Sequence, residues 1–204
     1  MAEPASAEPV DALQQIARQR RELALMHRVQ QALADRADFR TIVAEVGDAL
    51  APTFPAADLS IAWIDRGAGL VHRLYERQQG LRREVAPLPF LERGRTWAAL
   101  AGGRALVTGT WAEADAAGFG HDGDLPRPRS IALVPIRAAG ELCGFFRLED
   151  VGREQAFGVG EVSLLEGIAA SLGLVLRNAR LHDETRQARA QAEQRATELA
   201  IINS

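Results

Sequence analysis

Side chains able to do chemistry are few in this 204-residue sequence, and the densest group of them is His121-Asp122-Gly123-Asp124. One imidazole and two carboxylates on a loop could bind a cation. Aspartate and glycine are also typical of solvated turns, and we favour that interpretation of this stretch. The one cysteine, Cys143, stands in an apolar run and is expected to be a small core residue. A single cysteine predicts neither a disulfide framework nor a clustered thiolate metal site.

Several function classes lack their sequence signatures here. There is no Gly-x-Ser-x-Gly, no His-Glu-x-x-His and, because the chain contains no lysine, no lysine-bearing phosphate loop. The net charge is −3 and no basic stripe alternates with aromatic residues, so no nucleic-acid partner is predicted. The sequence has no signal-peptide pattern and no run of about 18 apolar residues. We therefore expect a cytoplasmic protein fragment without membrane contact.

Strand patterns fill the middle of the sequence, and helical patterns flank them. The segment 58–65, DLSIAWID, alternates with period two and is largely apolar on both faces, which predicts a central strand covered on both sides. The last two expected strands are also apolar on both faces. Strands are expected at 58–65, 70–78, 81–88, 130–137 and 141–150, and a short strand is expected after Gly102-Gly103. Helices are expected at about 10–34, 38–50 and 161–204, with shorter helices between the strands. Sequential antiparallel strands flanked by helices predict an α+β fold.

The final expected helix has two halves. Its first half carries a broad apolar face that must pack on the domain. Beyond Asn178 a narrower stripe repeats in alternating steps of four and three, which is the heptad spacing of a coiled coil. This stripe consists of Leu181, Thr185, Ala188, Ala192, Arg195, Leu199 and Ile202. Together with Leu23 and His27 on the N-terminal helix, it predicts a parallel homodimer through the terminal helices.

The order and spacing of motifs towards the C-terminal end resemble those of the GAF domain family. The motifs are Pro135 in one strand, Gly144 in the next, then Phe157, Leu164-Leu165, Ala169 and Asn178-Ala179-Arg180-Leu181. The resemblance spans about residues 22–182. It implies an antiparallel sheet of about five to six strands, with the N- and C-terminal helices packed on one face. It also implies a pocket and short helices on the other face.

The resemblance implies that the irregular segment around residues 97–129 walls a small-molecule pocket. Its aromatic walls would be Trp97, Trp111 and Phe119, with His121 or Arg129 as a polar anchor. The same aromatic residues could instead fill a collapsed pocket, and both possibilities stay open. The residues typical of cyclic-nucleotide-binding and bilin-binding members are incomplete here. One cysteine also cannot complete the thiol cycle of members that reduce methionine sulfoxide. No cofactor is identified.

Three segments are expected along the chain: a disordered N-terminus (1–9), a GAF domain with its N-terminal helix (10–180), and a C-terminal signalling helix (181–204). Glu198-Leu199-Ala200 repeats Glu22-Leu23-Ala24, which indicates that a second module begins at the end of this fragment. The expected function is a non-catalytic sensor in a bacterial signalling protein of the histidine kinase or nucleotide cyclase type. It would relay ligand or partner binding to a downstream output or second GAF domain. The alternatives are a ligand-free dimerisation module and, third, an enzyme acting through His121.

Overall fold

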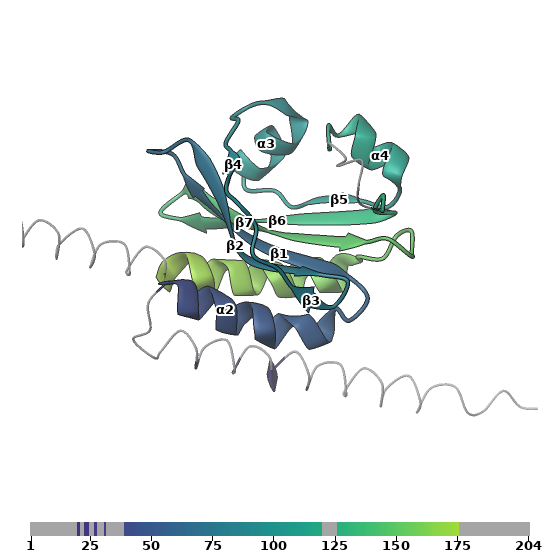
Figure 1. Ribbon diagram of the computed structural model, residues 1–204, viewed down its shortest axis with the longest axis horizontal. Helices are drawn as coiled ribbons and strands as arrows, with labels where there is room; N and C mark the ends of the chain where they lie inside the picture. Colours follow the sequence, from purple (N-terminus) through teal and green to yellow (C-terminus); the bar gives the residue numbers. More distant parts are fainter. Residues whose placement is uncertain are drawn as a thin grey trace, which may run out of the picture.

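The structure, a computed structural model, describes residues 20, 23, 24, 27, 31, 39–119 and 126–175, and these form an α+β fold. Pro52 and Pro55 follow the end of the helix Phe39–Leu50, as the sequence predicts, because proline cannot continue a helix beyond its first turn. A last helix, unlabelled in Figure 1 and drawn in yellow-green, covers 159–175. The other elements are α2 (Phe39–Leu50), the 3-10 helix η1 (Ala51–Thr53), β1 (Asp58–Asp65), β2 (Leu70–Gln78), β3 (Leu81–Arg82), β4 (Leu88–Pro89), α3 (Gly94–Ala101), β5 (Leu106–Thr108), α4 (Trp111–Ala116), β6 (Ser130–Ala138) and β7 (Glu141–Asp150).

The described strands form one antiparallel sheet in the order β3-β2-β1-β7-β6-β5, with the short β4 also paired to β2. Helix α2 and the helix 159–175 lie side by side on one face of this sheet, and α3 and α4 lie on the other face (Figure 1). This layering is the one implied by the family resemblance. The main difference is at 81–88, where one strand was expected. Only Leu81–Arg82 and Leu88–Pro89 pair with β2, and Pro87 in the intervening segment has no N–H to donate to a ladder.

The main hydrophobic core lies between the sheet and its two covering helices. Strand alternation directs Ile61 of β1, Val134 of β6 and Phe146 of β7 into this layer, and all three are at most 1% exposed. Helix α2 contributes Val46 and the helix 159–175 contributes Ile168, both fully buried. The apolar periodicity that predicted these helices is therefore the face that packs on the sheet.

Two glycines let the covering helices approach the strands closely. A β-carbon on Gly47 of α2 would lie 2.1 Å from Cδ2 of Tyr75, a buried ring on β2. A β-carbon on Gly173 would lie 2.0 Å from the backbone oxygen of Arg137 on β6. Real β-carbons do not approach other atoms this closely, so both glycines fix how their helices rest on the sheet.

Candidate ligand-binding site

The sheet face opposite the terminal helices is divided into an apolar half and a polar half. In the apolar half, Trp97 of α3 and Phe119 both pack against a buried aliphatic cluster, and Phe90 meets Trp97 edge to face with ring centroids 5.0 Å apart. This half is a second hydrophobic core filled by its own side chains. The buried aliphatic cluster consists of Ile64, Leu100, Leu133 and Leu142.

The polar half follows from strand register. Ser60 of β1 pairs with Glu76 of β2 on one side and with Arg147 of β7 on the other, so these three residues share one row across the sheet. Asp58 of β1 pairs with Glu149 of β7 two residues further along each strand. Because side chains alternate along a strand, both rows point to the face opposite the terminal helices.

A β-bulge brings one more charged residue to this face. Ile61 pairs with Tyr75, but the next residue of β1, Ala62, pairs with Arg73 rather than with Leu74. The extra residue in β2 shifts the alternation by one position. Arg73 therefore shares a face with Glu76, although the two residues are three positions apart.

These charged groups range from buried to partly exposed, and they are only partly paired. Arg147 donates to Glu149, and Arg73 Nη1 lies 3.8 Å from Oε1 of Glu76. Glu76 is only 6% exposed, yet its Oε2 accepts no hydrogen bond from the described part of the chain. The Nε groups of Arg73 and Arg147 are likewise buried without an acceptor there. Three buried polar atoms in one cluster are unusual, because buried polar groups are normally hydrogen-bonded.

The surroundings of Glu76 disfavour its ionised form. Burial raises the pKa of the Glu76 carboxyl, and the hydroxyl of Ser60 and the nearby charges of Arg73 and Arg147 offset this rise only in part. The carboxyl of Glu149 adds to the rise. A carboxylate kept under these conditions is a common feature of binding and catalytic sites.

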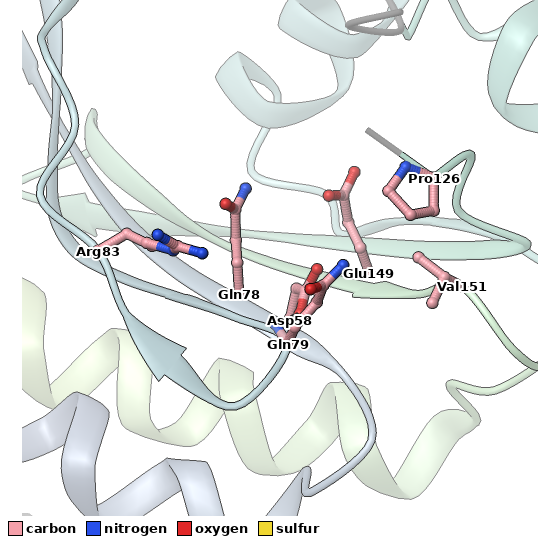
Figure 2. Close-up of a pocket in the computed structure, with 7 residues that line it drawn as sticks. All are labelled: Asp58, Gln78, Gln79, Arg83, Pro126, Glu149 and Val151. Carbon is pink, nitrogen blue, oxygen red and sulfur yellow. Dashed lines mark hydrogen bonds between the residues drawn. The ribbon is translucent and has the colours of Figure 1, made fainter. Parts of the chain in front are cut away.

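A small cavity opens next to the two rows of polar residues. Its volume is about 70 Å³, and Asp58, Gln78, Arg83 and Glu149 give it a polar lining. Figure 2 shows Gln78 and Glu149 rising from the sheet on the same side, from β2 and β7. Glu149 both lines the cavity and pairs with Arg147, so the cavity adjoins the charge cluster, but Glu76, Arg73 and Arg147 are not among its lining residues. The remaining lining residues are Gln79, Pro126 and Val151.

Strand β2 also makes a polar contact on the helix side of the sheet. The hydroxyl of Tyr75 donates to Oδ1 of Asp48 on α2 at 3.1 Å. Arg82 stacks its guanidinium 3.8 Å from the centre of the Tyr75 ring and reaches the same carboxylate. Burial, followed by the contact with Asp48, raises the pKa of Tyr75. Neighbouring residues of one strand, Tyr75 and Glu76, therefore contact α2 and the polar face respectively.

The turn after β7 anchors the edge of the cavity. Oδ1 of Asp150 accepts from the backbone N–H groups of Gly152 and Arg153 at 2.9 Å, and its Oδ2 accepts from the Arg153 guanidinium. Burial alone would raise the pKa of Asp150, but its hydrogen bonds with Arg153 and Gly152 hold it below its usual value. Asp150 lies between Glu149 and Val151 of the cavity, so this turn fixes the cavity rim.

The structure separates the residues expected to line a pocket. Trp97 and Phe119 share the apolar half. Trp111 instead begins α4, and the Cζ atom of Arg127 lies 5.7 Å from the centre of the Trp111 ring. Arg129 is exposed, and its backbone N–H donates to the backbone oxygen of Asp150 at 2.7 Å. His121 lies outside the described residues.

The residues expected to form the dimer helices are described only in part. Leu23 is helical and 70% exposed, and His27 is helical and exposed. The stripe from Leu181 to Ile202 lies outside the described residues. Within the described ranges, no group of three or more His, Cys, Asp and Glu side chains could hold a metal ion. No helix in those ranges is both long and apolar enough to cross a membrane.

The polar half of the sheet was not expected from the sequence. The strand at 141–150 was expected to be apolar on both faces, which is wrong for the second half of β7, where Arg147 and Glu149 alternate with buried Phe146 and Leu148. Charged residues at every second position of a central strand were the available signal. A charged residue seldom occupies a covered sheet face without a specific reason.

The comparisons with known proteins concern the fold and the family. A family model described as GAF domain matches residues 36–177. A GAF domain of a phosphoenolpyruvate-protein phosphotransferase from Coxiella burnetii aligns with TM-score 0.64 and 16% identity, over 80% of this chain and 96% of that one. Residues 122 to 287 of a methyl-accepting chemotaxis protein align with TM-score 0.61 and 13% identity, over 78% and 99%.

The same fold also occurs in an enzyme. Free methionine-R-sulfoxide reductase from Neisseria meningitidis, in complex with its substrate, aligns with TM-score 0.58 and 18% identity, over 79% of this chain and 93% of that one. At these identities the alignments show the fold alone. No match was found among curated proteins. Because the family model covers residues 36–177, well over half of the sequence, the chain belongs to the GAF domain family.

Proposed function

We propose that this protein is a non-catalytic sensor that binds a small polar molecule on the polar half of the sheet and relays its occupancy to the terminal helices. The observation that carries the proposal is the buried, incompletely paired cluster around Glu76 beside a polar cavity. Leaving such groups unpaired costs stability, and a bound ligand offsets that cost by pairing them.

Strand β2 offers a physical route for the relay. Glu76 belongs to the polar face, and the adjacent Tyr75 holds α2 through Asp48. A ligand that shifts β2 changes the packing of Tyr75 against α2, because the Tyr75 ring packs directly against Gly47 of that helix. From α2 and the helix 159–175, the change would reach a second GAF domain or an output domain of a bacterial two-component or cyclase protein. It would travel through a homodimeric coiled coil that includes Leu181, Thr185, Ala188, Ala192, Leu199 and Ile202.

Two alternatives make different predictions. A ligand-free dimerisation module is favoured by the apolar half, where Trp97 and Phe119 fill the space that a larger ligand would need. The sulfoxide reductase is an enzyme with the same fold, but the one cysteine of this sequence cannot complete a thiol cycle alone. That cysteine, Cys143, bonds the backbone oxygen of Glu141 within β7. We therefore rank the sensor first, the dimerisation module second and a His121-dependent enzyme third.

The proposal is tested by a thermal-shift screen of the dialysed protein against a panel of small polar metabolites. We expect at least one compound to raise the unfolding midpoint by several degrees, as binding at about 100 times the dissociation constant stabilises a protein by about 2.7 kcal/mol. The shift should disappear in Arg147→Gln and persist in Arg104→Gln, which changes an exposed arginine outside this cluster. A panel that shifts nothing, in a protein that is dimeric, favours the dimerisation module.

A further inference from the structure

Two carboxyl side chains are buried within the described ranges, and their surroundings are opposite. Asp150 is 1% exposed and both of its oxygens are bonded, Oδ1 to the N–H groups of Gly152 and Arg153 and Oδ2 to the Arg153 guanidinium. Glu76 is 6% exposed, and its Oε2 accepts no hydrogen bond from those ranges. Because hydrogen bonds to a carboxylate favour its ionised form, Asp150 is held in that form more firmly than Glu76.

The charges that face Glu76 compensate its carboxylate only in part. The nearest is Arg73, whose Nη1 lies 3.8 Å from Oε1 of Glu76, which is longer than a hydrogen bond. Arg147 donates to Glu149 on its own strand, so another carboxylate already offsets its charge. Burial therefore raises the pKa of Glu76 even though Ser60, Arg73 and Arg147 oppose the rise, and Glu149 adds to it. The other charged residues close to this row are Asp58, which pairs with Glu149, and Arg83, whose N–H donates to the backbone oxygen of Glu76.

A proton is a ligand that Glu76 can bind without any opening in the structure. Oε2 of Glu76 is buried, and Glu76 does not line the cavity, so a larger ligand in the cavity would not reach this atom. A proton on Oε2 removes the negative charge of the side chain and adds an O–H donor. The cluster then changes from two arginines facing two glutamates to two arginines facing one.

The bulge in β2 connects this charge to the helix side of the sheet. The register with β1 shifts between Tyr75 and Arg73, so the bulge directly precedes Glu76. The bulge places Arg73 on the face of Glu76, and the attraction between the two side chains favours this backbone while Glu76 is ionised. Tyr75 lies at the bulge, and its hydroxyl donates to Asp48 of α2 at 3.1 Å. A change in the bulge therefore moves a residue that contacts α2.

We propose that Glu76 is a proton-operated switch. Ionised Glu76 holds the β2 bulge together with Arg73, and protonated Glu76 releases the bulge and changes the packing of Tyr75 on α2. The proton comes from the solvent and binds Oε2, and no other bond is made or broken. The inference rests on the relay through β2 that the proposed function uses, and it adds regulation of that relay by pH. Mild acidification then changes the packing of α2 with or without a bound ligand.

An NMR titration of the 204-residue protein between about pH 4 and pH 8 tests the switch. The Glu76 carboxyl carbon, identified by its loss in Glu76→Gln, should titrate with a midpoint above 4.5. Backbone amides of α2 around Gly47 should show a shift with the same midpoint. This shift should be lost in Glu76→Gln, which cannot ionise. It should be kept in Glu141→Gln, which changes an exposed carboxyl at the start of β7.

Three results would overturn the switch. The first is a Glu76 midpoint at or below 4.5, since burial would then not favour the proton. The second is a set of α2 amides that show no shift at the Glu76 midpoint, or that keep the same shift in Glu76→Gln. The third is unfolding of the natural protein before the Glu76 signal moves. The metabolite screen, carried out at constant pH, decides ligand binding separately, and a screen without a binding compound leaves the proton switch standing.

Discussion

At the scale of single residues, Glu76 is the residue whose environment departs most from what folding alone requires. Its pKa is raised in the folded state above its ordinary value of 4.5, so the folded protein holds the proton more tightly than the unfolded chain does. Its contribution to stability is therefore fully present below pH 4.5 and is lost as the pH rises through the folded-state pKa. Ionising Glu76 in the folded state therefore costs free energy, and such a cost is often retained where a residue serves function.

This predicts how Glu76→Gln changes stability with pH. At pH 7 the variant should unfold at a higher urea concentration than the natural protein, because a neutral amide replaces a desolvated carboxylate. The advantage should shrink as the pH falls towards 4.5, where Glu76 is protonated and resembles the amide. Urea denaturation at several pH values measures both. A variant that is less stable at pH 7 would mean that the arginine pairing outweighs the cost of burial.

Arg73 shows why part of the site was not predictable at the residue scale. In a regular strand, residues 73 and 76 point to opposite faces, since the side-chain period is two. The bulge that brings them together lies where the pairing of β1 with β2 shifts between Ile61 and Ala62. No residue type in β2 predicts this bulge. Arg147 and Glu149 were different, because their alternation with Phe146 and Leu148 is visible in the sequence.

At the scale of elements, the contact between Gly173 and the backbone of Arg137 is predicted to position the C-terminal helix. Alanine at 173 would gain about 1 kcal/mol of helix propensity. It would lose about 1–3 kcal/mol through overpacking, since its β-carbon would lie 2.0 Å from a backbone oxygen that cannot turn aside. Because the two effects oppose each other, we expect Gly173→Ala to lower the unfolding free energy by up to about 2 kcal/mol, measured by urea denaturation.

A nearby substitution in the same helix provides the control for this prediction. Ser171 bonds only the backbone oxygen of Gly167 among its described contacts, so Ser171→Ala should leave stability nearly unchanged. If Gly173→Ala is as stable as Ser171→Ala, the helix can slide on the sheet. In that case the close contact does not fix its position.

Elements were more predictable than the site because their signals are local. The apolar periodicity located α2, β1, β6 and β7 to within a few residues, and the prolines at 52 and 55 follow the end of α2 as expected. The division of the face opposite the terminal helices into an apolar half and a polar half could not be predicted. The segment containing Phe90 and α3 covers one half of it, and this depends on packing between distant segments.

At the scale of the whole molecule, the exposed leucines predict association through the terminal helices. Leu23 is 70% exposed and Leu174 on the last helix is 65% exposed, and a dimer through the terminal helices would cover both side chains. We expect light scattering to give a dimer at tens of micromolar. Leu23→Glu combined with Leu199→Glu should raise the dimer dissociation constant at least 10-fold. A monomeric natural protein at that concentration would contradict the proposed dimer.

The central proposal is that a ligand bound on the polar face changes the packing of the helices on the opposite face. Amide hydrogen exchange with and without a compound that binds tests it most directly, comparing the natural protein with Tyr75→Phe, which loses the bond to Asp48 but keeps the ring. We expect the ligand to slow exchange in β2 and β7 of both proteins and to change exchange in α2 of the natural protein, with a weaker change in the variant. A ligand effect confined to the sheet, with α2 unchanged in the natural protein, would contradict it.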